Sequence, residues 1–185
     1  MEIIQGNNNV LSELITLGDY VRELIGSGKS TAEIERVLAS KDGYKNVTIL
    51  SVIEMANITF KAKTNNAPNV GDANSHTDLL VDQQGRDIGT MKGQGWKIAS
   101  LPDDSVISWY HETAETPLGR IETAGIWNSS AIWAGQWQSL FAAGVSGDVM
   151  GKIGVRQLYQ DIPREKYLTL IVLLPLDQIK SLIKK

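Results

Sequence analysis

The chain has 185 residues and a formal net charge of -3, from 18 Lys and Arg against 21 Asp and Glu. This length suits one domain with a short appendage, and the balanced charge offers no electrostatic footprint for nucleic acid. The absence of cysteine excludes disulfide scaffolds, thiolate zinc sites and cysteine nucleophiles, and the two histidines, His76 and His111, make a histidine-rich metal site unexpected.

Residues 1–45 predict an N-terminal extension of two helices. Apolar residues recur at spacings of three and four from Val10 to Leu24, which is typical of an amphipathic helix. The Gly-Ser-Gly sequence at residues 26–28 ends this helix, and a Ser-x-x-Glu capping box that begins at Ser30 starts the next one.

Residues 46–185 predict a β domain with a short helix at its C-terminal end. The hydrophobic period changes to two, and Val, Ile, Thr and Trp become common between glycine-containing turns. Short connections imply antiparallel neighbours, so we expect an eight-stranded up-and-down β-barrel, with a sandwich as the alternative. The expected strands are 47–63, 77–83, 87–99, 105–114, 118–128, 132–143, 149–159 and 167–174.

An eight-stranded barrel has an interior that side chains fill or that holds one small ligand. Tyr110, Gln136, Gln138 and Arg156 are polar residues in otherwise apolar or small-residue strands, and Glu54 lies between two apolar neighbours. An apolar cavity with a few polar groups is typical of a small-molecule site. The sequence therefore predicts such a cavity.

Two local sequence patterns are weaker evidence for a function. Gly93-Gln94-Gly95 resembles part of a dinucleotide fingerprint, but it lacks the third glycine and the following helix. His111 lies in the middle of an expected strand, where a lone histidine is more often structural or exposed than catalytic.

Three motifs carry a family resemblance: Ile88-Gly89-Thr90, Gly144-Val145-Ser146-Gly147 and Gly154-Val155-Arg156-Gln157. With them, over half the chain resembles the small β-barrel cyclases that form spirotetronate polyketides, and it is more distantly similar to allene oxide cyclase and dirigent-type barrels. The helical extension is similar to that of the cyclase of pyrroindomycin biosynthesis, which we expect to be the nearest relative.

The resemblance implies an intramolecular [4+2] cycloaddition (a Diels-Alder reaction) between a diene on a linear polyketide and an exocyclic alkene on a tetronate or tetramate ring, which forms a spiro-conjugate. Such a reaction moves no protons, so no metal or cofactor is expected. Holding the reacting groups together contributes up to ~7–11 kcal/mol. A hydrogen bond to the ring carbonyl adds ~1–3 kcal/mol.

The resemblance also assigns residues, because Tyr110 and Arg156 match the tyrosine and arginine of the family's cavity. If both face inward, strand alternation fixes the phase of their neighbours. The residues expected to anchor the acidic ring are Tyr110, Gln136, Gln138 and Arg156. The residues expected to contact the substrate are Glu54, Ile121, Thr123, Trp127, Leu140 and Leu158 in the barrel, with Leu14 and Leu17 on the first helix.

The same phase predicts that Trp133, Trp137 and His111 face outward, where aromatic side chains favour a homodimer. We expect the helix at residues 10–25 to be a lid over the barrel mouth, with a fixed plug or a dimer contact as alternatives. No apolar run is long enough to span a bilayer, so the expected location is cytoplasmic. A non-catalytic lipocalin-like binding barrel and a dirigent-like stereo-directing protein remain open as alternative functions.

Overall fold

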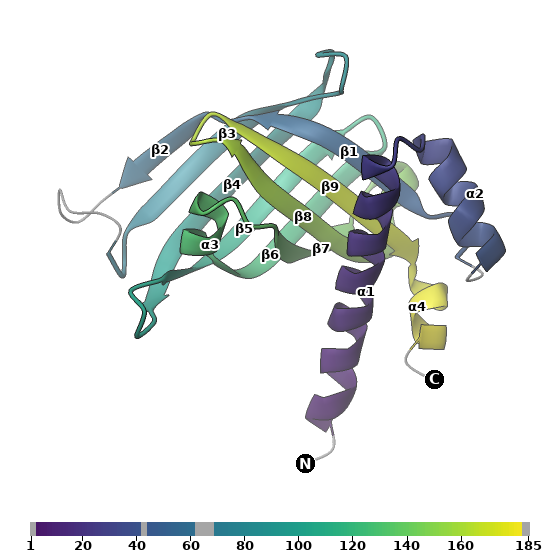
Figure 1. Cartoon of the computed structure of the whole chain (residues 1–185), viewed down its shortest axis with the longest axis horizontal. Helices are drawn as coiled ribbons and strands as arrows, with labels where there is room; N and C mark the ends of the chain where they lie inside the picture. Colours follow the sequence, from purple (N-terminus) through teal and green to yellow (C-terminus); the bar gives the residue numbers. More distant parts are fainter. Residues whose placement is uncertain (1–2, 42–43, 62–68, 183–185) are drawn as a thin grey trace.

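The computed structural model describes residues 3–41, 44–61 and 69–182, which form a β-barrel with helices against its outer wall (Figure 1). In chain order the elements are α1 (Ile3–Gly26), α2 (Thr31–Lys41), β1 (Thr48–Met55), β2 (Ile58–Lys61), β3 (Ala73–Val81), β4 (Asp87–Ser100), β5 (Val106–Thr116), β6 (Gly119–Asn128), α3 (Ser129–Trp133), β7 (Gln138–Gly144), the 3-10 helix η1 (Gly147–Val149), β8 (Lys152–Ile162), β9 (Lys166–Pro175) and α4 (Leu176–Leu182).

Within the described residues, eight antiparallel strands close into a barrel. The sheet order runs β1-β9-β8-β7-β6-β5-β4-β3, and β1 also pairs with β3, as in the register Glu54 to Leu80. The short strand β2 adds to the far end of β3. The predicted barrel is therefore confirmed and the sandwich alternative is wrong, because closure pairs the two edges that a sandwich leaves open.

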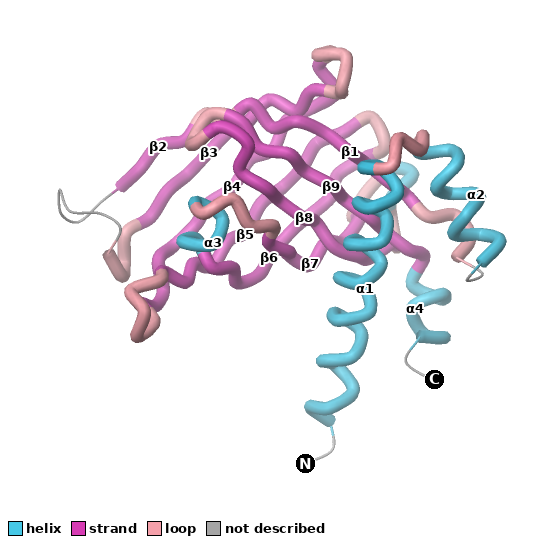
Figure 2. The backbone as a smooth tube through the Cα atoms, in the orientation of Figure 1, coloured by secondary structure: helices cyan, strands magenta, loops and turns pink. Residues whose placement is uncertain are grey.

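Several of the expected strands differ from the structure. The strand expected at 77–83 begins earlier, at Ala73, and the strand expected at 149–159 begins later, at Lys152, because residues 147–149 form η1. The strand expected at 47–63 is broken into β1 and β2, because the backbone N–H of Asn57 turns to donate to the side chain of Asp78; residues 62 and 63 lie outside the described residues. The first part of the strand expected at 132–143 is α3 instead, since the Asn128 side chain caps a helical turn by accepting from the Ala131 N–H. Figure 2 shows this turn between β6 and β7.

The barrel interior is closed at one end by a plug of inward-facing apolar side chains. Its members come from β1, β3, β4, β5, β6, β7 and β9 and from η1, and they are fully or nearly buried. They are Val52, Leu80, Met91, Ala114, Ile121, Ala142, Val149, Ile171 and Leu173. The interior beyond this plug, toward α3 and β2, remains available for a site.

Helix α1 lies across the outer wall of the barrel. Leu14, Leu17 and Val21 pack with Val155 of β8 and Val172 of β9, whose side chains point away from the interior. Figure 1 shows α1 crossing β8 and β9. The expectation that Leu14 and Leu17 contact the substrate from a lid is therefore wrong in this structure, because the apolar stripe of α1 is buried in a second core formed with α2 and α4.

A glycine and a polar clamp fix α1 on the wall. A Cβ at Gly18 would lie 3.0 Å from the side chains of Val155 and Gln157, so glycine lets the helix approach the sheet closely. Gln157 donates to Asp19 at 2.7 Å and accepts from Arg22 at 3.0 Å. The helix is thus tied to β8 by both apolar and polar contacts.

The structure agrees with the predicted outward positions of His111 and Trp137 and differs for Trp133. His111 is exposed on β5. Trp133 belongs to α3, and Trp137 is partly covered by Arg22 and Tyr159. Trp96 and Trp109 pack on each other on the outer face of β4 and β5, with ring centroids 5.4 Å apart. The homodimer stays a prediction. In the described ranges, no helix is both long and apolar enough to cross a bilayer.

The position of α1 predicts a role in stability. Leu14 is 2% exposed, whereas Leu11 on the same helix is 42% exposed. Leu14→Ala should lower the free energy of unfolding by about 2–5 kcal/mol, because it leaves a cavity in the outer core. Leu11→Ala should change it by less than about 0.5 kcal/mol. Urea denaturation measures both, and equal effects of the two variants would contradict the observed packing.

Candidate active site in the barrel interior

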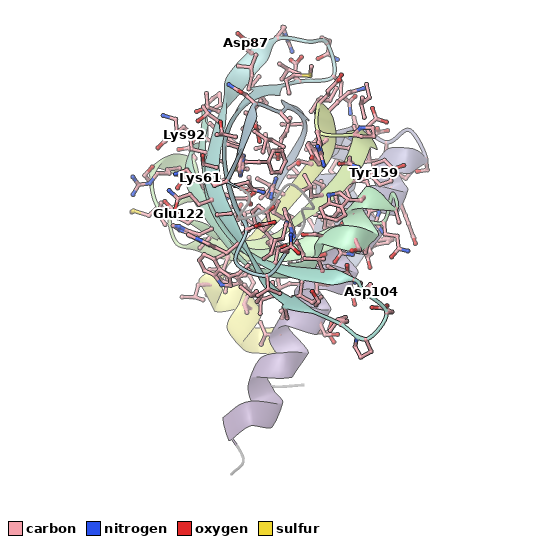
Figure 3. All side chains as sticks on the ribbon, turned by 90° about the vertical axis from the view of Figure 1, so that its left-hand side faces the viewer. Lys61, Asp87, Lys92, Asp104, Glu122 and Tyr159 are labelled. Carbon is pink, nitrogen blue, oxygen red and sulfur yellow. The ribbon has the colours of Figure 1, made fainter. Side chains whose placement is uncertain are left out.

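A cavity opens in the half of the barrel opposite the plug and contains about 460 Å³ of empty space, including its open mouth. Figure 3 views the molecule from the side of β2 and α3; there the labelled Lys92 and Glu122 lie on the outside of the wall. The lining residues come from seven strands and from α3. They are Glu54, Ile58, Asn74, His76, Asp78, Tyr110, Glu112, Trp127, Ser129, Ile132, Trp133, Arg156, Leu158 and Tyr167.

The floor of this cavity is a charged cluster around Arg156, which is 1% exposed. Its Nη2 donates to both oxygens of Glu54 at 2.8 Å, and its Nη1 donates to Glu112 at 2.6 Å. Thr169 also donates to Glu54, and Thr123 donates to Glu112 at 2.9 Å. The interior is therefore not the mainly apolar cavity that the sequence predicts: a layer of ion pairs separates the plug from the mouth.

His76 extends the cluster across β3. Its Nδ1 lies 2.6 Å from Asp78 and its Nε2 lies 3.2 Å from Glu112, so each ring nitrogen faces a carboxylate. Burial by itself would lower the pKa of His76, but the hydrogen bonds and charges of Asp78 and Glu112 outweigh it and raise this pKa to about 10. His76 is therefore an imidazolium that donates from both nitrogens.

The two glutamates differ in their protonation. Burial raises the pKa of Glu54, and the charge of Arg156 offsets this only in part. Burial also acts on Glu112, but Arg156 and His76 together hold its pKa below the usual value. Glu112 is thus the carboxylate that faces two cations, and Glu54 is the carboxyl group of the cluster that more readily holds a proton.

Two glycines of β4 make room for these side chains. A Cβ at Gly93 would lie 2.4 Å from His76 Nε2, and a Cβ at Gly95 would lie 2.4 Å from the ring of Tyr110. In the sheet, Gly93 lies between His76 on β3 and Glu112 on β5. The Gly93-Gln94-Gly95 sequence therefore serves packing inside the barrel rather than phosphate binding.

Toward the mouth the cavity holds aromatic side chains and polar atoms without partners. Tyr110 and Trp127 pack with ring centroids 4.2 Å apart. Asn74 donates from Nδ2 to the Tyr110 hydroxyl at 2.7 Å. Within the described residues, Asn74 Oδ1, Trp127 Nε1 and Arg156 Nε are buried without a hydrogen-bond partner. Because buried polar atoms are costly when unpaired, these atoms are the ones that a bound ligand would satisfy.

The acidic and histidine side chains of the cavity are engaged with each other. Both nitrogens of His76 face carboxylates, and both glutamates contact Arg156. Among the described residues, no three His, Asp or Glu side chains converge as metal ligands. The cluster is organised as an ion-pair network.

Comparison with known proteins now places this geometry in a family. The model of the allene oxide cyclase barrel-like domain matches residues 53–173, which is most of the barrel. The chain belongs to this family. No curated protein sequence matches it.

Solved structures share the fold of this allene oxide cyclase-like barrel. The Diels Alderase AbmU from Streptomyces koyangensis is 24% identical, with a TM-score of 0.65 over 75% of this chain and 74% of that chain. A nonspecific heme-binding cyclase that catalyses [4 + 2] cycloaddition during neoabyssomicin biosynthesis is 23% identical, with a TM-score of 0.67 over 81% and 78%. Pyocyanin demethylase is 13% identical, with a TM-score of 0.58 over 68% and 99%. At these identities the likeness shows the fold.

The structure brings five of the twelve predicted site residues to the wall of the cavity, while their roles stay predictions. These five are Tyr110, Arg156, Glu54, Trp127 and Leu158. Tyr110 and Arg156 face inward in the predicted strand phase. Leu140 packs behind the mouth with Leu158, and Thr123 supports the charged cluster through Glu112.

Five other predicted residues lie elsewhere. Ile121 belongs to the plug, beyond the charged cluster. Gln138 accepts from the Asn128 N–H and donates to the Trp137 carbonyl, so its amide serves the connection around α3. Gln136 is exposed, because the segment between α3 and β7 is not a strand. Leu14 and Leu17 lie on the outer wall, as described above.

Sequence reasoning missed the contributions of β3 and α3. Asn74, His76 and Asp78 alternate along β3 and all face the cavity. Their spacing of two is a visible signal, but the expected strand began at residue 77, and none of its residues was matched to a cavity residue of the family. The Asn-Ser-Ser sequence at 128–130, between two of the expected strands, is a helix-capping signal.

The shifted pKa of His76 predicts a pH-dependent stability. Since its pKa of about 10 lies above the ordinary 6.5, the charged His76 stabilises the fold below pH 6.5, and this contribution is lost as pH rises toward 10. Burial lowers the pKa of Lys97 to about 8, which acts in the opposite direction only above pH 8. Between pH 6.5 and 8 the free energy of unfolding should therefore fall by up to about 2 kcal/mol.

Urea denaturation at stepped pH measures this slope. His76→Gln should flatten it. A slope that persists at full strength in His76→Gln would contradict the assignment of the pH dependence to His76.

The close approach at Gly93 gives a second test. Gly93→Ala places a methyl group 2.4 Å from His76 Nε2 and 2.5 Å from Glu112 Cγ, so the two side chains must separate. We expect a loss of about 1–3 kcal/mol of stability and a weaker pH slope. Gly26→Ala is the matched control, because a Cβ there meets nothing within 4 Å. Equal stability of the two variants would refute the packing role of Gly93.

Proposed function

We propose that this protein is a cyclase that catalyses an intramolecular [4+2] cycloaddition of a linear polyketide with a tetronate or tetramate ring, giving a spiro-conjugate product. The observation that carries this proposal is a cavity whose mouth holds aromatic and apolar side chains together with buried hydrogen-bonding atoms that have no partner within the described residues. The Diels-Alderases that share the fold support the same reaction class.

The unpaired atoms match a ring that carries both an acceptor and a donor. A ring carbonyl can accept from Trp127 Nε1–H and from the hydroxyl of Tyr110, whose own acceptor site is filled by Asn74. An enol O–H or lactam N–H of the ring can donate to Asn74 Oδ1. Burial raises the pKa of Tyr110, so this phenol stays protonated as a donor. Hydrogen bonds at the carbonyl withdraw electrons from the conjugated alkene and favour its reaction with the diene.

Arg156 takes a different role from the one expected from sequence. Both of its terminal nitrogens are used by Glu54 and Glu112, so its guanidinium is not free to pair with an acidic ring. We assign Arg156 to positioning: it holds the floor of the cavity rigid, and only its Nε faces away from the ion pairs without a partner.

The apolar walls of the cavity contribute more to the rate acceleration than the hydrogen bonds to the ring do. Ile132, Leu158 and Trp133 line the remainder of the mouth. A flexible chain folded between these side chains keeps diene and alkene close, which offsets the entropy that limits the uncatalysed reaction. The reaction needs shape and fixed donors, and the cavity has both.

Incubation with linear substrates tests this function. A tetronate or tetramate that carries a pendant diene should be converted to a product of identical mass and different retention, enriched in one stereoisomer. Heat-denatured protein is the control. Unchanged substrate together with saturable binding would contradict catalysis and favour the lipocalin-like binder.

Substitutions of the lining residues should show how much of the turnover depends on the hydrogen-bond donors and how much depends on the shape of the cavity. Tyr110→Phe should lower turnover by about tenfold or less, because it removes one hydrogen bond. Leu158→Trp should lower it more, because the larger side chain fills the cavity. Ile162→Trp, at the exposed end of the same strand, is the control and should retain full turnover. Full activity of Leu158→Trp would place the reaction outside this cavity.

A further inference from the structure

A second polar cluster lies beside the cavity, apart from the ions around Arg156. The Nζ of Lys97 on β4 is 2.9 Å from the Oγ of Ser108 on β5 and 3.1 Å from the Oγ of Ser129 in α3. The two serine oxygens are themselves 2.5 Å apart. An amine and two hydroxyls are thus in mutual hydrogen-bond contact, and the cycloaddition makes no use of them.

Burial of this cluster disfavours the charged form of the amine. Lys97 is 7% exposed. The rings of Tyr110 and Trp133, whose centres lie 5.6 Å and 5.4 Å from its Nζ, attract the charged form and act against the effect of burial. Burial lowers the pKa of Lys97 to about 8, and the negative charge of Asp72 offsets this only in part. A large share of Lys97 is therefore neutral in mildly alkaline solution and able to accept a proton.

The two serines differ in their access to the cavity. Ser129 is 3% exposed and lines the cavity, whereas Ser108 is fully buried behind it. The first turn of α3 is pinned on both sides of Ser129, because Asn128 caps Ala131 and the Ser130 hydroxyl accepts from the Val106 N–H at 3.0 Å. Ser129 is therefore held with its hydroxyl between the cavity and the amine.

We propose that Ser129 is a nucleophile for acyl transfer, with Lys97 as its general base and Ser108 as the positioning residue that orients the two. A nucleophilic hydroxyl within hydrogen-bond reach of a base that a third group orients is the arrangement this chemistry requires. This acyl transfer is a different activity from the proposed cycloaddition. The outcome of a test of one activity does not decide the other.

The step balances without a cofactor. Neutral Lys97 takes the proton of Ser129, directly or through Ser108, as the serine oxygen bonds to the carbonyl carbon of an ester. The bond to the leaving alcohol or thiol then breaks, and that group takes the proton from Lys97. Water cleaves the resulting serine ester by the same proton path, so the sum is hydrolysis.

The cavity supplies a donor for the developing oxyanion and defines the substrate class. Trp127 is directly opposite Ser108 in the sheet, and its buried Nε1–H has no partner within the described residues. Such a fixed donor stabilises charge that forms on a carbonyl oxygen. The neighbouring walls are apolar, from Ile132, Trp133 and Leu158. We therefore assign carboxylic esters or thioesters with an apolar acyl group as substrates.

The test uses the full chain and p-nitrophenyl acetate as the probe. We expect a burst of p-nitrophenolate and one acetyl group on the peptide that contains Ser129, released by hydroxylamine. The burst rate should rise with pH around the pKa of Lys97, about 8. Ser129→Ala should abolish the burst, and Lys97→Gln should slow it by about 100-fold.

Controls separate this chemistry from unspecific acylation and from misfolding. Ser51→Ala removes a half-buried serine on the outer side of β1 and should leave the burst unchanged. Melting temperatures show whether each variant folds, and the pH profile of the unaltered chain needs no variant. Acetyl found on Lys97 instead of Ser129, a burst that survives in Ser129→Ala, or no burst from folded protein at any pH would each overturn the proposal.

Discussion

The interior of this barrel is organised around one buried guanidinium, whose positive charge is compensated by carboxylates. Arg156 is placed on β8 in a closed, narrow interior, where an unpaired charge would cost several kcal/mol. Glu54 reaches it from β1 and Glu112 reaches it from β5, so the ion pairs join strands that are distant in sequence and lie across the barrel from one another. The identity of the surrounding residues follows from this pairing: Thr169 and Thr123 complete the carboxylate hydrogen bonds, and Gly93 leaves space for His76 to reach Glu112.

This charged layer divides the interior into two parts with different roles. Below it, the plug around Met91 and Ile121 is fully apolar and contributes stability. Above it, the mouth contains polar atoms without partners, which lower stability unless a ligand satisfies them. Because the plug and the outer core under α1 hold the fold together, the mouth is free to keep atoms that serve binding instead of packing.

The mouth joins two kinds of chemistry at one wall. Tyr110 and Trp127 offer donors fixed by strands, a geometry suited to holding a carbonyl in place. Lys97 lies 5.6 Å from the centre of the Tyr110 ring and contacts Ser129 of the short helix α3, which lines the same cavity. The proposed cycloaddition and the proposed acyl transfer would therefore use neighbouring parts of one cavity.

The sequence by itself determined the strands, the barrel and much of the strand phase. Period-two patterns and short turns are local properties, and a single matched residue such as Tyr110 fixes which side of its strand faces inward. Arg156 was matched to the family in the same way as Tyr110, and the strand phase set by the matches placed Trp127 and Leu158 on the cavity wall. The alternation rule gave no phase for β3. Asn74 and His76 alternate there with residues of similar polarity, so no hydrophobic contrast marked the buried side of the strand.

Only the tertiary structure decided where α1 lies and how the polar residues pair. An apolar stripe on a helix shows that this face of the helix is buried, but it does not show against which surface. Here the outward side chains of β8 and β9, together with Gly18, pack α1 against the barrel wall instead of over the mouth. The ion pairs of Arg156 and the contact between Lys97 and Ser129 join residues far apart in the chain. They depend on barrel closure and on the turn at α3, which local sequence patterns do not encode, because both are set by packing between distant segments.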